Sequence, residues 1–142
     1  MFKNPNIRTI HLRHYGDERG MLTTIEENSD IPFTIKRVYY LSNLSKDKKR
    51  ACHAHKLSQR VLIALNGSCN VSFFDGKEKY AYQLKSTTNE GAYFNSGIWC
   101  ELSDFEDNTI ILALSDMEYD EKEYIRNFDD YIRFKEGANQ WK

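Results

Sequence analysis

Short runs that favour β-strands, separated by turn signals, follow one another from residue 7 to residue 115. Residues 34–41 read TIKRVYYL and residues 60–66 read RVLIALN, both rich in the β-branched, aromatic and aliphatic side chains that strands prefer. Asp75-Gly76 is a hairpin signal, and Gly67-Ser68 marks another turn. About ten such runs, at spacings of roughly eight to twelve residues, are typical of a sandwich or barrel. The chain is therefore expected to be an all-β protein.

The expected strands leave room for helix only near the C-terminus. They cover residues 7–12, 21–26, 34–41, 51–55, 60–66, 69–74, 80–84, 92–94, 98–103 and 109–115. Beyond them, Tyr124, Phe128, Tyr131 and Ile132 recur near helical spacing, with charged residues between them. This pattern predicts one or two short helices within residues 119–134. A length of 142 residues fits a single domain over residues 1–142.

The charge balance and the apolar runs exclude several classes of protein. Lys plus Arg number 20 and Asp plus Glu number 21, so a net charge of −1 gives no general attraction to nucleic acid or an anionic membrane. Apolar runs such as 61–65 are far too short to span a bilayer, and the first residues lack the apolar core of an export signal. Cys52, Cys69 and Cys100 cannot all pair within one chain. We expect a cytoplasmic protein with reduced thiols.

The segment Arg50–His55 carries the clearest chemical signal, because it holds two histidines, His53 and His55. Side chains alternate between the two faces of a strand, so these two imidazoles are expected to point to the same side. Two imidazoles in one cavity can hold a metal ion or move a proton near neutral pH. A third interpretation is that both are ordinary strand residues with satisfied hydrogen bonds.

A metal site is the weaker interpretation on ligand chemistry. The metal-binding cupin pattern adds an acid a few residues after the two histidines and a third histidine on a later strand. Gln59 and Cys100 stand at those positions here. A neutral amide is a poor ligand for a divalent cation, and this set is not one that Mn, Fe or Zn usually selects. We therefore expect no metal ion and no other cofactor.

Acid/base chemistry on an anionic ligand accounts for more of the neighbouring residues. Tyr39 lies on the strand before the histidines, and guanidinium groups match phosphate oxygens in a two-pronged fashion. Gln59 and Trp99 complete the expected set, although a place in the core is the commoner role for a residue such as Trp99. The catalytic candidates are His53, His55 and Tyr39, and the substrate-binding candidates are Arg19, Arg37, Arg50, Gln59 and Trp99.

The chain resembles the cupin-fold dTDP-sugar 3,4-ketoisomerases. The resemblance is carried by ERGMLTTIEEN (18–28), IPFTIKRVYYL (31–41), the HAHK run, QRVLIALNGSCNV (59–71), WCELSDF (99–105) and LSDMEYDEKEYIRNFDDY (114–131). A short motif such as HxH is weak alone, but the order and spacing of these segments are much more specific.

This resemblance implies a cupin, that is, a jelly-roll β-sandwich, in a homodimer that exchanges N-terminal strands, and catalysis without a metal ion. The implied substrate is dTDP-4-keto-6-deoxyglucose, and a PLP-dependent aminotransferase would convert the product into a 3-amino sugar for surface glycans, such as lipopolysaccharide or S-layer glycan. By position, His53 matches the proposed base and His55 the second catalytic histidine. Cys100 stands where some relatives carry a histidine.

The implied reaction moves a carbonyl from C4 to C3 of the sugar through an enediol. It is proton abstraction next to a carbonyl and needs no redox cofactor. Three alternatives remain open from the sequence. They are a 3,5-epimerase on the same substrate, a metal-dependent cupin, and a sugar-nucleotide binding protein without activity. The sequence leaves the gluco or galacto configuration of the product at C4 open.

Overall fold

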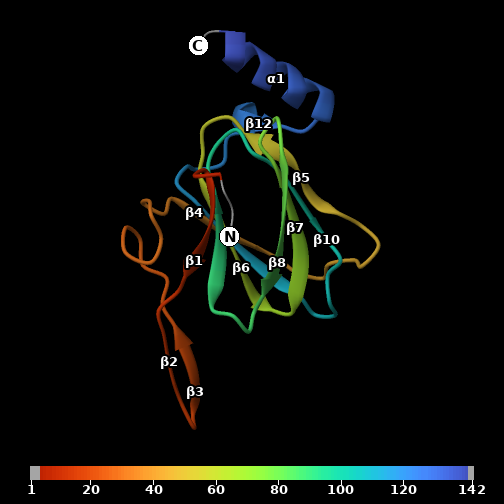
Figure 1. Cartoon of the computed structure of the whole chain (residues 1–142). Coiled ribbons are helices and arrows are strands. Elements are labelled where there is room, and N and C mark those ends of the chain that lie inside the picture. Colours follow the sequence, from red (N-terminus) through yellow and green to blue (C-terminus); the bar gives the residue numbers. More distant parts are fainter. Residues whose placement is uncertain (1–3, 141–142) are drawn as a thin grey trace.

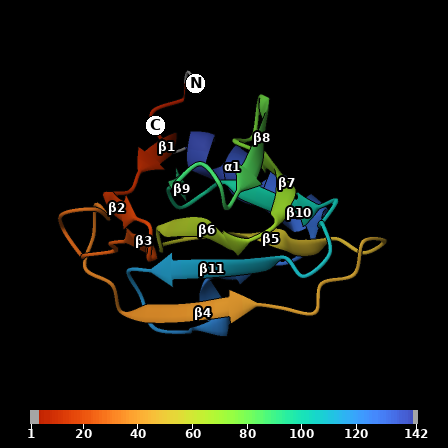
Figure 2. The same ribbon diagram turned by 90° about the horizontal axis from the view of Figure 1, so that it is seen from below.

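The computed structural model describes residues 4–140, which form two five-stranded antiparallel sheets packed face to face (Figures 1 and 2). The first sheet has the order β1 (Ile7–His11), β9 (Glu90–Phe94), β6 (Arg60–Asn66), β11 (Ile110–Ser115) and β4 (Arg37–Leu41). The second has the order β12 (Tyr124–Ile125), β5 (Arg50–His55), β10 (Trp99–Ser103), β7 (Ser68–Phe74) and β8 (Lys79–Lys85). The expected β-sandwich is confirmed.

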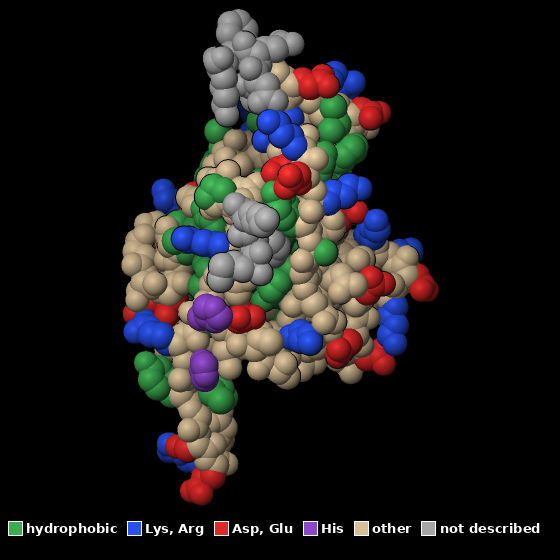
Figure 3. Space-filling view, in the orientation of Figure 1, with side chains coloured by type: hydrophobic (Ala, Val, Ile, Leu, Met, Phe, Trp, Pro, Cys, Tyr) green, Lys and Arg blue, Asp and Glu red, His purple; other side chains and the backbone are tan. Residues whose placement is uncertain are grey.

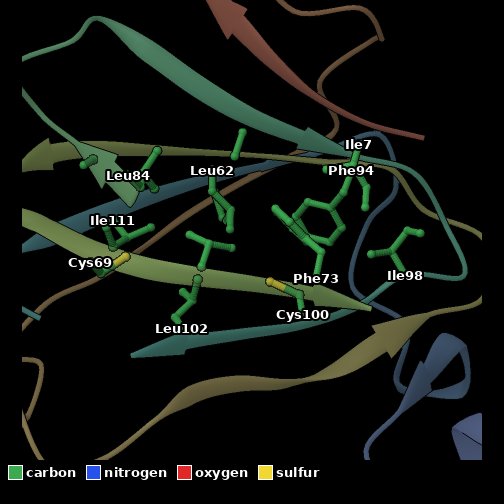
Figure 4. Close-up of a cluster of buried hydrophobic side chains, with 14 of the residues drawn as sticks. Ile7, Leu62, Cys69, Phe73, Leu84, Phe94, Ile98, Cys100, Leu102 and Ile111 are labelled. Atoms are coloured by element: carbon green, nitrogen blue, oxygen red, sulfur yellow. The ribbon is translucent and has the colours of Figure 1, made fainter. Parts of the chain in front are cut away.

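Residue alternation explains why these segments form a sandwich. On β6, Leu62 and Ala64 face the second sheet, where they join a large buried cluster with Phe73, Leu84 and Ile111 (Figure 4). The intervening residues of β6 face the other way and join a second buried cluster under the segment that precedes β4. Strand β6 is therefore buried on both faces, which accounts for its nearly continuous apolar sequence.

A small hairpin stands apart from the sandwich. Strands β2 (His14–Asp17) and β3 (Gly20–Thr23) pair only with each other and project from the body of the molecule (Figures 1 and 3). The sequence predicts a turn near residues 16–20 and a strand over 21–26, but it does not predict β2. The hairpin exposes Tyr15, Met21 and Leu22, each more than half accessible to solvent.

The C-terminal segment contains the expected short helical structure, but its bounds differ from the prediction. A single turn of 3-10 helix, η1 (Glu121–Glu123), leads into β12, and helix α1 begins only at Phe128 and continues to Gln140. The prediction of helix over residues 119–127 is therefore wrong, except for that one turn. The physical reason is tertiary: Tyr124 and Ile125 pair with His55 and Ala54 and satisfy the edge of β5.

Helix α1 packs against the second sheet and closes one end of it. The buried Tyr131 hydroxyl donates toward the carbonyls of Phe74 at 2.9 Å and Gly97 at 2.8 Å, and its ring lies 5.5 Å from that of Trp99. The helix thereby fixes β12 and the residues around it. Among the described residues, no helix has the length and apolar character needed to cross a membrane.

Candidate active site

A cavity of about 230 Å³ lies between the two sheets, where β4 and β6 face β5 and β12. Both sheets contribute side chains to its wall. The lining residues are Arg37, Tyr39, Leu41, Arg50, Ala51, His53, His55, Arg60, Leu62, Phe94, Cys100, Leu102, Ala113, Tyr119, Tyr124 and Arg126. The cavity contains the three catalytic candidates and two of the expected arginines.

The two histidines reach this cavity from one strand with a bulge. Ala51 and Cys52 have left-handed backbone conformations, with φ of 66° and 56°, and the pairing of β5 with β10 shifts register beside them. Neither residue type prefers this conformation, so the bulge stores local strain that the surrounding pairing must hold. Beyond the bulge, His53 and His55 point to the same side, with ring centroids 4.8 Å apart and planes at 81°.

Hydrogen bonds give the two imidazoles opposite proton positions. The Nδ1 of His53 lies 2.9 Å from the carbonyl oxygen of Ala51, which can only accept, so this Nδ1 carries the proton and Nε2 has a free lone pair. The Nδ1 of His55 lies 3.2 Å from Nη2 of Arg60, which can only donate. In its neutral form His55 therefore accepts at Nδ1 and carries its proton on Nε2.

Burial keeps both rings neutral. Loss of solvent lowers the pKa of His53 to about 4. It also lowers the pKa of His55 to about 2, and the positive charge of Arg60 adds to this effect. Both imidazoles are therefore uncharged at neutral pH. Although Glu123 Oε1 lies 3.5 Å from His55 Nδ1, a neutral ring that accepts from Arg60 forms no ion pair with it.

Aromatic rings and arginines surround the histidines. Arg37 donates from Nη1 to the Tyr124 hydroxyl at 2.9 Å, and its guanidinium lies over the rings of Tyr39 at 4.4 Å and Tyr119 at 4.9 Å. Burial raises the pKa of Tyr39, so its hydroxyl remains protonated. The cavity thus offers a neutral base, neutral donors and cationic groups close together.

Three of the expected substrate-binding residues lie outside this cavity. Arg19 is on the projecting hairpin and pairs with Asp17 at 2.6 Å. Gln59 donates from Nε2 to Asp116 at 2.9 Å and accepts from the Tyr93 hydroxyl at 2.5 Å.

Trp99 is 5% exposed and packs against helix α1, so the structure places it in the core, which is the other interpretation of this residue. Its indole N–H donates to Glu101 at 2.9 Å. Arg50, in contrast, is exposed and does line the cavity.

The sequence did not point to Arg60, Tyr119, Tyr124 and Arg126, which also line the cavity. Arg60 is the first residue of the apolar strand β6. A charged residue at the start of such an apolar run is the sequence signal that could have identified it. Tyr124 and Arg126 lie in the segment that was expected to be helical. Arg126 stacks on the Tyr124 ring at 4.4 Å and pairs with Glu121 at 2.6 Å.

The donor set around the cavity is poor for a metal ion. Within residues 4–140, no three His, Cys, Asp or Glu side chains are grouped so that they could hold one. Cys100 lines the cavity, but burial raises the pKa of its thiol far above the usual range, so it remains protonated and is a poor ligand or nucleophile.

Comparisons with known proteins agree on the family to which this chain is similar. The family model described as "FdtA: WxcM-like, C-terminal" matches residues 5–136. A curated protein from Aneurinibacillus thermoaerophilus, named TDP-4-oxo-6-deoxy-alpha-D-glucose-3,4-oxoisomerase, is 39% identical over 127 residues, which cover 89% of this chain and 91% of that protein.

Solved structures agree. The sugar 3,4-ketoisomerase QdtA from Thermoanaerobacterium thermosaccharolyticum, in complex with TDP, has a TM-score of 0.90 and is 38% identical over 94% of this chain and 97% of that chain. The rmlC epimerase of Mycobacterium tuberculosis has a TM-score of 0.75, covering 87% of this chain and 70% of that one. At 16% identity this second likeness shows the fold alone.

Proposed function

The chain belongs to the FdtA family, and we propose that it is a dTDP-sugar 3,4-ketoisomerase that moves the keto group of dTDP-4-keto-6-deoxyglucose from C4 to C3. One observation of the site carries the proposal. Two neutral histidines share one cavity, and their hydrogen bonds leave a free lone pair on one ring and an N–H on the other. This is the pair of groups that an isomerisation through an enediol requires.

His53 is the proposed base. The C4 ketone acidifies the neighbouring C3–H, and the free Nε2 of His53 removes that proton to give an enediolate. The lowered pKa of His53 keeps its ring unprotonated at the working pH, and the same lowering reduces the driving force for taking up the proton. The hydrogen bond from Nδ1 of His53 to the Ala51 carbonyl fixes both the position of the ring proton and the orientation of the ring.

His55 and Tyr39 are the proposed proton donors. Each is neutral and protonated at neutral pH, so each can donate to the oxygen on C4 as the enediol forms. The hydroxyl on C3 then loses its proton, C4 receives one, and the new ketone stands at C3. Every proton that leaves the sugar is returned, so the reaction needs no redox cofactor. The face of C4 that receives the proton decides between the gluco and galacto products.

Arginines are proposed to hold the nucleotide. Arg37 and Arg50 line the cavity, and Arg50 is exposed at its mouth, where a diphosphate can reach it without being fully buried. Arg19 lies on the hairpin, so it can serve a site only if the hairpin reaches one.

We propose that the hairpin reaches the site of a second copy. Strands β2 and β3 have no other strand partner in the described chain, and they expose Tyr15, Met21 and Leu22. A homodimer that exchanges this element would bury those side chains. Sedimentation analysis of the whole chain and of a Leu22→Glu variant tests this. A monomeric wild-type protein would contradict it.

The proposed product has a defined use. A keto group at C3 is the form of the sugar that a PLP-dependent aminotransferase accepts. The enzyme would therefore belong to a route to 3-amino sugars for surface glycans. We place this route in the cytoplasm. Its partners would be the sugar nucleotide and a second copy of itself, with no nucleic acid or membrane.

The test is incubation of the purified protein with dTDP-4-keto-6-deoxyglucose, a C3 aminotransferase and its amino donor, followed by proton NMR. A dTDP-linked 3-amino-3,6-dideoxy sugar supports the proposal, and its coupling pattern gives the configuration at C4. Exchange of the C3 and C5 hydrogens with the ketone still at C4 would instead indicate a 3,5-epimerase. Tight dTDP binding without any turnover would indicate a binding protein.

A further inference from the structure

Arg60 occupies an unusual place for a charged residue. It is the first residue of β6, the central strand of its sheet, and pairs with Phe94 on one side and Ser115 on the other. Its side chain points between the sheets and is only 2% exposed. A guanidinium at such a position loses its water, and the loss must be offset by interactions within the protein or with a ligand.

Only one of the three guanidinium nitrogens of Arg60 has hydrogen-bond partners within the protein. Nη2 donates to His55 Nδ1 at 3.2 Å and to the Tyr124 hydroxyl at 3.2 Å, and it lies 3.8 Å from Glu123 Oε1. Nε and Nη1 have no hydrogen-bond partner, and in the part of the chain that the structure describes they are the only buried side-chain nitrogen or oxygen atoms in that condition. Buried polar groups without partners are rare and often mark a functional site.

Arg37 and Arg126 are less buried than Arg60, although Arg60 resembles Arg37 in donating to Tyr124 and in lying over the Tyr39 ring, at 5.8 Å. Arg37 donates to Tyr124 and stacks on two aromatic rings, and Arg126 pairs through two nitrogens with Glu121. Arg60 therefore combines burial, positive charge and unused donors beside the two histidines. Donors that are aimed in advance at a place where negative charge develops are a strong means of lowering a barrier.

We propose that Arg60 is a further catalytic residue, in which the unpartnered Nε–H or Nη1–H donates to the sugar oxygen that becomes negatively charged when the base removes the C–H proton. This inference rests on the proposed ketoisomerase function. In the step, the C3–H bond breaks and its proton goes to Nε2 of His53. The electron pair forms the C3=C4 double bond, and the electrons of the C4=O bond move onto O4. The negative charge thus appears on O4, which Arg60 binds.

Two features favour this oxygen over the diphosphate as the partner of Arg60. Arg60 is almost fully buried and contacts His55 directly, so it lies where the proton transfers occur. The exposed Arg50 is the better placed group for a diphosphate. Arg60 also cannot give up its own proton, so it can stabilise the anion without neutralising it prematurely.

The experiment compares the wild-type protein with Arg60→Gln, which keeps a hydrogen-bonding side chain of moderate size but removes the charge. Turnover of dTDP-4-keto-6-deoxyglucose, the dissociation constant for dTDP, and exchange of the C3 hydrogen in D2O are measured on each. Loss of a single anion-binding donor typically lowers kcat by ~10²–10³-fold. We expect a fall of that order for Arg60→Gln, a matching fall in C3 hydrogen exchange, and a dTDP dissociation constant within about twofold of wild type.

Arg133→Gln is the matched control, because Arg133 is exposed on helix α1 and pairs with Asp130. Arg60→Lys is the second variant. It keeps the buried charge near Glu123 but lacks the planar, fixed donors of a guanidinium, so kcat is expected to fall by about tenfold with dTDP binding unchanged. If Arg60→Gln does not fold, Arg60→Lys alone decides.

Several results would overturn the inference. One is a kcat within about threefold of wild type in Arg60→Gln, or an unchanged kcat in Arg60→Lys if that variant must decide. Another is a dTDP dissociation constant that rises in step with the loss of activity, which would assign Arg60 to the diphosphate. A wild-type protein without turnover would instead contradict the proposed function, so the two failures are distinguishable.

Discussion

The interior of the sandwich differs between its two ends, although β6, β9, β10 and β11 contribute side chains to both. Toward β7 and β8, the space between the sheets is filled by side chains such as Phe73, Leu84 and Ile111, each 0% exposed (Figure 4). Toward β4 and β5, positions that point inward carry titratable groups, and a cavity remains. Strand β6 joins the two ends, with Arg60 at the cavity and Ala64 in the packed cluster.

The two ends of the sandwich therefore have different roles, although side chains alternate between the faces of the strands at both ends. The packed end supplies the burial that stabilises the fold, and it holds the strands rigidly. The open end uses that rigidity to keep polar groups at fixed distances in a site with little water, which is where their pKa values and proton positions are controlled. Substitutions at the two ends should therefore affect different measurements.

The largest effect is expected at the open end from His53→Asn. Removal of a positioned base typically costs ~10²–10⁴-fold in rate. Turnover should fall at least ~10³-fold, while the dTDP dissociation constant and the melting temperature change little, because Asn is smaller and polar. Steady-state kinetics and calorimetry check this. His11→Asn, on an exposed side chain of β1, is the control, and near-normal isomerisation by the His53 variant would contradict the assignment of the base.

The corresponding change at the packed end is Phe73→Ala. Phe73 is fully buried and its ring lies 5.1 Å from that of Phe94, so truncation leaves a cavity in the core. The free energy of unfolding should fall by ~3–5 kcal/mol, as for other buried Phe to Ala changes. Urea denaturation measures it. A loss below about 1 kcal/mol would show that this end is not the rigid part of the molecule.

A smaller effect is expected for the two cavity arginines that are proposed to hold the diphosphate. Arg37→Gln and Arg50→Gln, made singly, should raise the dissociation constant for dTDP in at least one case by about tenfold, which is about 1.4 kcal/mol. Titration calorimetry at low and high salt checks this, since a charge contact weakens as salt rises. If neither variant changes dTDP binding by that amount, the diphosphate rests elsewhere and these two arginines have another role.

The smallest effect is expected for the dependence of kcat/KM on pH. His53 has an unfolded pKa near 6.5 and a folded pKa of about 4, so it remains a free base well below the pKa of ordinary imidazole. The acid limb of kcat/KM should therefore lie below about pH 5. An acid limb near pH 6.5 would mean that His53 is solvated in the working enzyme.

The same shift links His53 to stability. Between the two pKa values the unfolded chain binds a proton that the folded chain does not, so the free energy of unfolding decreases as pH falls through that window. Above it both states are neutral at this residue, and the contribution vanishes. Denaturation of wild type and His53→Asn across this range isolates the effect, because the variant lacks the titrating group.

The sequence predicted the packed end better than the open end. The strands expected over residues 60–66 and 69–74 match β6 and β7, because apolar and aromatic side chains mark buried strands. Within any strand, side chains two residues apart lie on the same face, which is the rule of alternation. The same rule put His53 and His55 on one side, and the structure places both in the cavity with Tyr39. The proposed roles of these residues remain predictions.

What the sequence missed depends on contacts between distant segments. Tyr124 follows a helical spacing locally, yet pairing with β5 makes it a strand residue that faces the cavity. Arg60 received no role from the sequence beyond being the first residue of an apolar strand, yet it is buried. The bulge at Ala51 and Cys52 has no local signal, because neither residue favours a positive φ. In each case the partner lies far away along the chain.

The central claim is that the cavity holds two neutral imidazoles with opposite proton positions. Nitrogen-15 NMR of labelled histidine rings between pH 5 and 8 tests it directly, because protonated and unprotonated ring nitrogens give separate signals. The account predicts a proton on Nδ1 of His53 and on Nε2 of His55, unchanged across this range. A His53 that is doubly protonated at pH 7, or that carries its proton on Nε2, would have no lone pair for the sugar and would contradict the account.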